Sequence, residues 1–264
     1  MIVDYHMHLR APDGSIDHSV DAVLRFVEAA AERGVDEIGF SEHVYYFQET
    51  RSLWSVPYHL ERCVYPIEPY VQAVVEAKQR GLPVKLSLEV DYVPGREEET
   101  AELLETYPWD YLLGSIHLIG QHAVDSDPRL VDEFGVEEAW HRYYDTLEAA
   151  ARSGLFDVLS HPDLVRMYGP ELSWDWSGVA ASLDGVRLEV SSAGLHKPHG
   201  KLYPNPDLLR EAKQRGAEIT LASDAHAPQD VGRDLERAIE HARSVGYETV
   251  TVFEGRQARQ EQLG

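Results

Sequence analysis

The chain has 264 residues, a formal net charge of −22 and 43% hydrophobic residues, which fits a globular protein with a full core. The acidic balance excludes nucleic acid as a partner, because such binding depends on lysine and arginine side chains that displace counterions. No apolar run approaches the roughly 20 residues of a membrane helix. The N-terminus also lacks a basic segment followed by an apolar one, so we expect a cytoplasmic protein with no membrane partner.

Cysteine usage limits the kind of metal site that the chain can form. Cys63 is the only cysteine, so an intramolecular disulfide and thiolate-rich metal sites are both excluded. Any bound metal must therefore be held by nitrogen and oxygen, and the 13 histidines supply many such donors.

Strand and helix patterns alternate along the chain. A basic residue and a glycine repeatedly separate a helical pattern from an apolar, β-branched run, as in "AERGVDEIGF" and "KQRGAEITLAS". Strands are predicted at 2–6, 36–41, 84–90, 110–116, 155–160, 186–191, 217–223 and 247–253, the last followed by a short tail. Helices are predicted at 17–33, 67–80, 96–106, 136–153, 174–183, 206–215 and 229–245.

This alternation favours a parallel sheet that is covered by helices on both faces. The length fits one α/β barrel domain over residues 1–264, closed or nearly closed, and an open doubly wound sheet is the second choice. The segment 44–68 is too long for an ordinary loop between strand and helix and is rich in aromatic residues. We therefore interpret it as a functional insertion beside the active site.

Histidines and carboxylates mark the ends of six of the seven predicted barrel strands. In "YHMH", His6 and His8 are two residues apart, so their side chains share one face of the strand. The full set comprises His6, His8, Glu42, His43, Glu89, Asp91, His117, His161, Asp163, Asp224 and His226. Carboxyl ends of barrel strands meet at one face, so these side chains are predicted to converge there.

Such a mixture of imidazoles and carboxylates exceeds the needs of one ion. Neutral imidazole suits zinc, iron and manganese, and mixed sites commonly hold two or more of these metals. Paired ions acidify a bound water and hold the oxygens of an in-line displacement, which is typical of phosphate-ester hydrolysis. The pattern therefore predicts a hydrolytic metal centre.

The motifs "HMH", "SEH", "LEVD", "SIH", "SHPD" and "SDAH" together resemble the polymerase and histidinol phosphatase (PHP) family over nearly the whole chain. The segments "LLGSIH", "HPDLVRMYG" and "EVSSAGLHKPHGKLYPNPDLLREAKQRGAEITLASDAH" look most like its histidinol-phosphate phosphatase branch. The resemblance implies a distorted (β/α)7 TIM-like barrel with three divalent ions, zinc, iron or manganese. It also implies hydrolysis of L-histidinol phosphate to L-histidinol and phosphate in histidine biosynthesis, by attack of a metal-bridging hydroxide.

The resemblance also implies a ligand set for each ion. The first ion would take His6, His8, Glu89 and Asp224, with Glu89 as a bridge. The second would take His43, His161 and Asp13, and the third Glu89, His117 and His226. Asp13 in "APDG" stands one residue closer to His8 than in the usual family pattern, which often has histidine there, and His18 is the alternative.

Further roles are expected around the metals. Arg166 and Lys197 follow the fifth and sixth strands and are expected to neutralise the phosphoryl oxygens. Asp224 or a water would supply the proton for the leaving alkoxide. Glu42, Asp91 and Asp163 are expected to orient ligating imidazoles.

Other interpretations stay open at the level of sequence. Another PHP phosphoesterase, such as a protein-tyrosine phosphatase or a general small-molecule phosphatase, would carry the same motifs and take a phosphate monoester as its partner. A non-catalytic metal-binding module is the alternative from a different class. The sequence does not decide whether the chain forms a homo-oligomer.

Overall fold

A parallel sheet forms the centre of the molecule in the computed structural model, which describes residues 1–168 and 170–264. Within these residues seven strands pair in the order β1-β2-β3-β4-β7-β8-β9, which follows the chain. The strands are β1 Val3–Asp4, β2 Glu37–His43, β3 Val84–Asp91, β4 Leu113–Ser115, β7 Val158–Leu159, β8 Arg187–Ser191 and β9 Ile219–Ala222. Each lies within a range predicted from the sequence or reaches a few residues beyond it.

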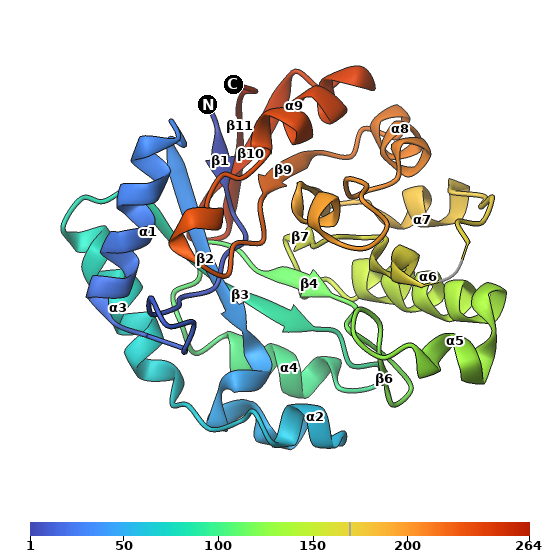
Figure 1. Cartoon of the computed structure of the whole chain (residues 1–264), viewed down its shortest axis with the longest axis horizontal. Helices are drawn as coiled ribbons and strands as arrows, with labels where there is room; N and C mark the ends of the chain where they lie inside the picture. Colours follow the sequence, from blue (N-terminus) through green and yellow to red (C-terminus); the bar gives the residue numbers. More distant parts are fainter. Residues whose placement is uncertain (169) are drawn as a thin grey trace.

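The two edge strands meet and close the sheet. The backbone N–H of Tyr5 donates to the carbonyl of Leu221 at 3.0 Å, and that of His8 donates to the carbonyl of Ala225 at 2.8 Å. The sheet is therefore a barrel, not an open doubly wound sheet, and helices surround it (Figure 1). The predicted distorted (β/α)7 barrel is confirmed.

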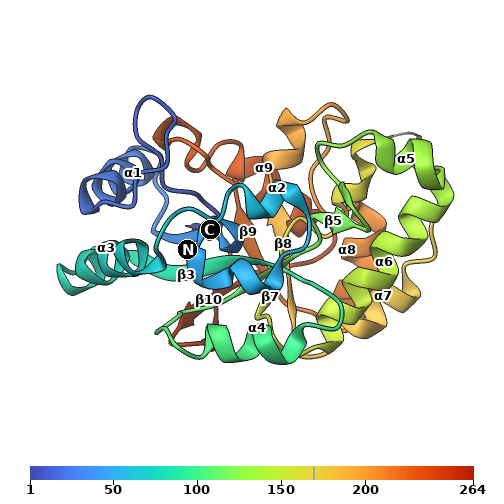
Figure 2. The same cartoon turned by 90° about the horizontal axis from the view of Figure 1, so that it is seen from below.

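The surrounding helices bury one apolar stripe each against the strands. In α6, Ala139, Tyr143 and Leu147 recur at four-residue spacing and are all buried, as the sequence pattern predicted. The main helices are α1 Val20–Glu32, α3 Ile67–Gln79, α4 Glu97–Leu104, α6 Val136–Arg152, α7 Ser177–Ser182, α8 Pro206–Gln214 and α9 Leu235–Ser244. Figure 2 shows them from below. None of the helices within the described residues has the length and apolar character needed to cross a membrane.

The insertion at 44–68 is folded and not irregular. It contains two 3-10 turns, Val44–Tyr46 and Gln48–Leu53, and the short helix α2 Pro57–Leu60. Thr50 links the two 3-10 turns, because its buried hydroxyl donates to the carbonyl of Phe47 at 2.8 Å and accepts from the indole of Trp54 at 2.9 Å. The aromatic residues of this segment thus have fixed positions beside the carboxyl ends of the strands.

The opposite, amino end of the barrel is filled by aromatic rings. Tyr111 packs inside the barrel, and a Cβ at Gly39 would overlap its hydroxyl, so only glycine fits at that point of β2. Phe253 stacks on Tyr111 with ring centroids 5.2 Å apart. It belongs to β10, Thr249–Glu254, which pairs antiparallel with β11, Gln257–Gln262, where the sequence predicted only a tail.

Candidate metal centre

Among the described residues, eight imidazoles and carboxylates gather at the carboxyl ends of the strands, around Glu89 of β3. The Glu89 side chain is buried, and its Oε1 lies 3.0 Å from His161 Nε2 and 3.1 Å from His117 Nε2. Its Oε2 lies 2.6 Å from His43 Nδ1. One carboxylate is therefore shared by imidazoles from several strands, as a bridging ligand requires.

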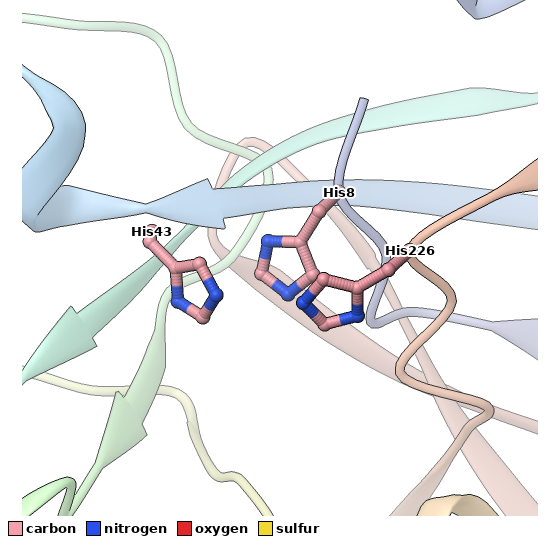
Figure 3. Close-up of side chains that lie close together, drawn as sticks. All are labelled: His8, His43 and His226. Atoms are coloured by element: carbon pink, nitrogen blue, oxygen red, sulfur yellow. The ribbon is translucent and has the colours of Figure 1, made fainter. Parts of the chain in front are cut away.

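The potential ligand atoms form four groups of three, each within 4.8 Å. The groups are His6, His8 and Asp224; His6, Glu89 and His161; His43, Glu89 and His117; and His8, His43 and His226. Figure 3 shows the last group, whose three imidazoles face one another. Every predicted ligand except Asp13 belongs to at least one group.

The donor atoms fit a metal centre. The Nε2 atoms of His6 and His8 are buried and have no hydrogen-bond partner among the described residues. Leaving such atoms unpaired in a protein interior is costly, whereas coordination satisfies them. Imidazole nitrogen with carboxylate oxygen is a set that suits zinc, iron or manganese.

Carboxylates behind the cluster fix the orientation of its imidazoles. Three histidines contact a buried acid through Nδ1: His6 with Glu189 at 2.7 Å, His8 with Glu42 at 2.9 Å, and His117 with Asp91 at 2.9 Å. These contacts turn each Nε2 toward the cluster, as outer carboxylates of metal sites do.

Glu189 was missed by the sequence analysis, which treated the strand in "EVSS" as the one without a functional end. The structure buries Glu189 in β8, where it also accepts the backbone N–H of His161 at 3.1 Å. The sequence does contain a signal for Glu189, because a carboxylate within an apolar strand needs a buried partner.

The charges of the cluster depend on each other. Burial alone would raise the pKa of Glu89, but the imidazoles of His117, His6 and His43 outweigh burial and hold this pKa well below its usual value. Burial alone would lower the pKa of His117, but Glu89 and Asp91 raise it well above its usual value. In the absence of metal, protons therefore occupy part of the cluster.

Two of the potential ligands have unusual backbone conformations. His161 has φ of 25° and Asp224 has φ of 54°, in the region that favours glycine. Such conformations persist where surrounding structure enforces them, and they concentrate at functional sites. Both turns follow shortly after a barrel strand, and His161 and Asp224 each contribute a donor atom to the cluster at the carboxyl ends of the strands.

The structure does not bring Asp13 into the cluster. Asp13 is exposed, and its carboxylate accepts the backbone N–H of Ser15 at 3.0 Å. Arg10 explains this outcome, because it is buried, pairs with Glu42 at 2.8 Å and bridges to Ile16, so that residues 11–15 turn outward.

His18, the alternative to Asp13, also lies outside the four groups. Its Nε2 contacts Glu42 Oε1 at 3.2 Å and faces that carboxylate. Within the four groups, His161 stands with His6 and Glu89, while His43 stands with Glu89 and His117 or with His8 and His226.

The predicted cationic residues have different environments. Arg166 is buried and contacts Asp163 at 2.9 Å and Glu171 at 3.1 Å, so it does not line the cavity over the cluster. Asp163 consequently holds Arg166 and not an imidazole, against expectation. Lys197 does line the cavity.

That cavity has a volume of about 190 Å³ and opens over the cluster. The 44–68 insertion contributes Tyr45, Tyr46, Tyr58 and His59 to its wall, and the β5–β6 region contributes Asp125. The site therefore combines potential metal ligands, one lysine and an aromatic wall, which suits a small phosphorylated compound.

Comparisons with known proteins agree with this geometry. The PHP domain model matches residues 4–190. A Deinococcus radiodurans protein named "Probable histidinol-phosphatase" is 33% identical over 258 residues, covering 95% of this chain and 96% of that protein. The histidinol-phosphatase of Bacillus subtilis is 26% identical, covering 90% of this chain and 98% of the relative.

A solved structure has the same fold. It is a histidinol phosphate phosphatase from Lactococcus lactis in complex with zinc, L-histidinol and phosphate, and it superposes with a TM-score of 0.76. The match covers 98% of each chain at 21% identity, which establishes a common barrel architecture.

Proposed function

Since the chain belongs to the PHP domain family, we propose that it is a metal-dependent phosphatase that hydrolyses L-histidinol phosphate to L-histidinol and phosphate. The observation that carries this proposal is the Glu89 carboxylate within contact distance of three imidazoles, His43, His117 and His161, beneath a small cavity. The names of the relatives favour the same substrate.

The proposal assigns the cluster to divalent ions, three in number, as the family resemblance implies. The groups containing His6 with Asp224, His117 with Glu89, and His43 with His226 each offer three donors. When bound, such ions acidify a water and neutralise phosphoryl oxygens. Zinc is supported by the Lactococcus lactis complex, while imidazole and carboxylate donors also suit iron and manganese.

The residues of the chain have separable roles in this reaction. Lys197 reaches the cavity as a half-buried cation, and we assign it to the phosphoryl oxygens. Arg166 acts indirectly by fixing the loop after β7 through Asp163.

Asp224 is assigned to metal binding. Burial alone would raise its pKa, but His6, His8 and His226 hold it well below the usual value. An ionised carboxylate suits a ligand and does not suit a proton donor, so water is the proposed source of the proton for the leaving alkoxide.

The test is phosphate release by protein of measured metal content. Substrates would be L-histidinol phosphate, phosphotyrosine, an aryl phosphate and single-stranded DNA. We expect kcat/KM for L-histidinol phosphate to exceed the others by about a hundredfold or more. Similar rates for all monoesters would show that the protein is a general phosphatase and would overturn the proposed substrate. A protein that bound no metal and was inactive would favour a non-catalytic binding module.

A further inference from the structure

Two charged side chains in the cavity stand outside the potential metal ligands, and they have opposite signs. Asp125 and Lys197 both line the cavity, and both are half-buried. Within the part of the chain that the structure describes, neither makes a side-chain hydrogen bond or ion pair. A small cavity that combines one uncommitted anion with one uncommitted cation is complementary to a ligand that carries both charges.

The position of Asp125 is fixed by its connection to the metal cluster. The backbone N–H of Val124 donates to the carbonyl of His117 at 2.8 Å, so the residue before Asp125 is tied to a potential ligand. The strands β5, Leu118–Ile119, and β6, His122–Ala123, form an antiparallel pair that leads into this segment. Asp125 is therefore held at the cavity by ordered backbone.

A second acid shows what a structural carboxylate in the same segment does. Asp127 contacts His122 Nδ1 at 2.9 Å and Arg129 Nε at 2.8 Å. His122 in turn contacts Glu133 at 2.7 Å, so this network anchors the segment to α5, Arg129–Phe134. This network holds the segment to α5 without Asp125, so the Asp125 carboxylate is free to bind a ligand.

We infer that Asp125 binds the ammonium group of the substrate and thereby selects phosphate monoesters of amino alcohols. This inference rests on the proposed function, in which Lys197 and the metals take the phosphoryl end. L-Histidinol phosphate carries an ammonium close to its phosphate, whereas a general aryl phosphate carries none. An ion pair inside a half-buried cavity is screened less than one on the surface, so Asp125 discriminates between these substrates.

The experiment compares two substrates that differ only in the amine. L-Histidinol phosphate and 3-(imidazol-4-yl)propyl phosphate would be assayed with wild-type protein and with Asp125→Asn, each at known metal content. We expect Asp125→Asn to lower kcat/KM for the aminated substrate by about 10- to 100-fold and to leave the other substrate unchanged. Asp132→Asn, on the exposed face of α5, removes the same charge nearby and should change neither value.

The outcomes separate the inference from the proposed function. If wild-type protein prefers L-histidinol phosphate and Asp125→Asn keeps that preference, the inference is wrong and the proposed function stands. A parallel loss on both substrates would also overturn the inference, since it would indicate a structural role. If wild-type protein hydrolyses an aryl phosphate but not L-histidinol phosphate, the proposed function fails and the inference fails with it.

Discussion

The two ends of the barrel both contain buried charge, but they use it differently. At the amino end, Asp110 accepts Lys78 Nζ at 2.7 Å, the backbone N–H of Leu86 at 2.8 Å and that of Gly255 at 3.1 Å. At the carboxyl end, His6 and His8 each pair through Nδ1, while Nε2 has no hydrogen-bond partner among the described residues.

This contrast separates a stabilising network from a functional one. At the amino end, Asp110 has its hydrogen-bond partners within the chain. The carboxyl end satisfies one side of each imidazole and keeps the other for a ligand. Substitutions at the two ends should therefore affect different measured quantities.

The largest effect is expected from Glu89→Ala at the carboxyl end. Loss of the shared carboxylate removes a contact to His43, His117 and His161, so the metals should be lost. Activity should fall by on the order of 10³-fold or more, because metal stabilisation of the transition state is worth several kcal/mol. Metal analysis and phosphate release measure both effects. A variant that kept its metals and its rate would contradict the assignment of the cluster.

Asp110→Ala at the amino end should instead reduce stability. It leaves Lys78 and two backbone N–H groups without their buried partner, at a cost of about 3 kcal/mol in the free energy of unfolding. Denaturant unfolding measures this cost, and kcat of the folded variant should be unchanged. Glu76→Gln, which breaks a half-exposed pair with Arg80, is the control and should cost less than about 1 kcal/mol.

Glu189→Gln should weaken metal binding without abolishing it. The substitution removes the negative charge behind His6, and outer carboxylates of this kind contribute about 10- to 100-fold to metal affinity. Titration of the metal-free protein with zinc or manganese gives the affinity directly. If the affinity for metal were unchanged and the stability reduced, Glu189 would stabilise the fold, as Asp110 does, and would not support metal binding.

A further prediction concerns pH. Burial would lower the pKa of His6, but Glu189 and Glu89 raise it well above its usual value, so metal must displace its proton. Affinity should rise by about tenfold per pH unit for each displaced proton until the pH passes this raised pKa. Metal titrations between about pH 6 and 8 test the slope. Flat affinity over this range would show that no proton is displaced.

The same raised pKa has a consequence for the metal-free protein. The protonated His6 imidazole stabilises the folded state. This contribution is complete below the pKa of histidine in the unfolded chain, and it is lost as the pH rises through the raised pKa of His6 in the folded protein. Metal-free protein should therefore lose stability at alkaline pH more than metal-loaded protein does. Thermal unfolding of both forms over pH measures the difference.

Local patterns were sufficient to predict the barrel and most of the cluster. His43 and Glu89 stand on β2 and β3, and His6 and His8 follow β1 within four residues, so the chain topology brings them to one face. Strand ends are the part of a barrel where sequence position translates most simply into spatial position.

Features that depend on partners distant in sequence could not be predicted in this way. Asp13 turns outward because Arg10 pairs with Glu42, more than thirty residues away. Arg166 forms ion pairs with Asp163 and Glu171 and does not reach the cavity.

Strand β11 was missed for a different reason. Its residues are almost all polar and exposed, so they show no apolar alternation. It is held by backbone pairing with β10.

The left-handed backbone at His161 and Asp224 limits how this protein can be made more robust. A non-glycine residue in a sparsely populated conformation costs about 1 to 3 kcal/mol, so glycine would relax either turn. Glycine would also delete a donor atom from the metal cluster. Stability and activity are therefore opposed at these two positions, and directed evolution under thermal selection alone should drift toward glycine there as catalysis is lost.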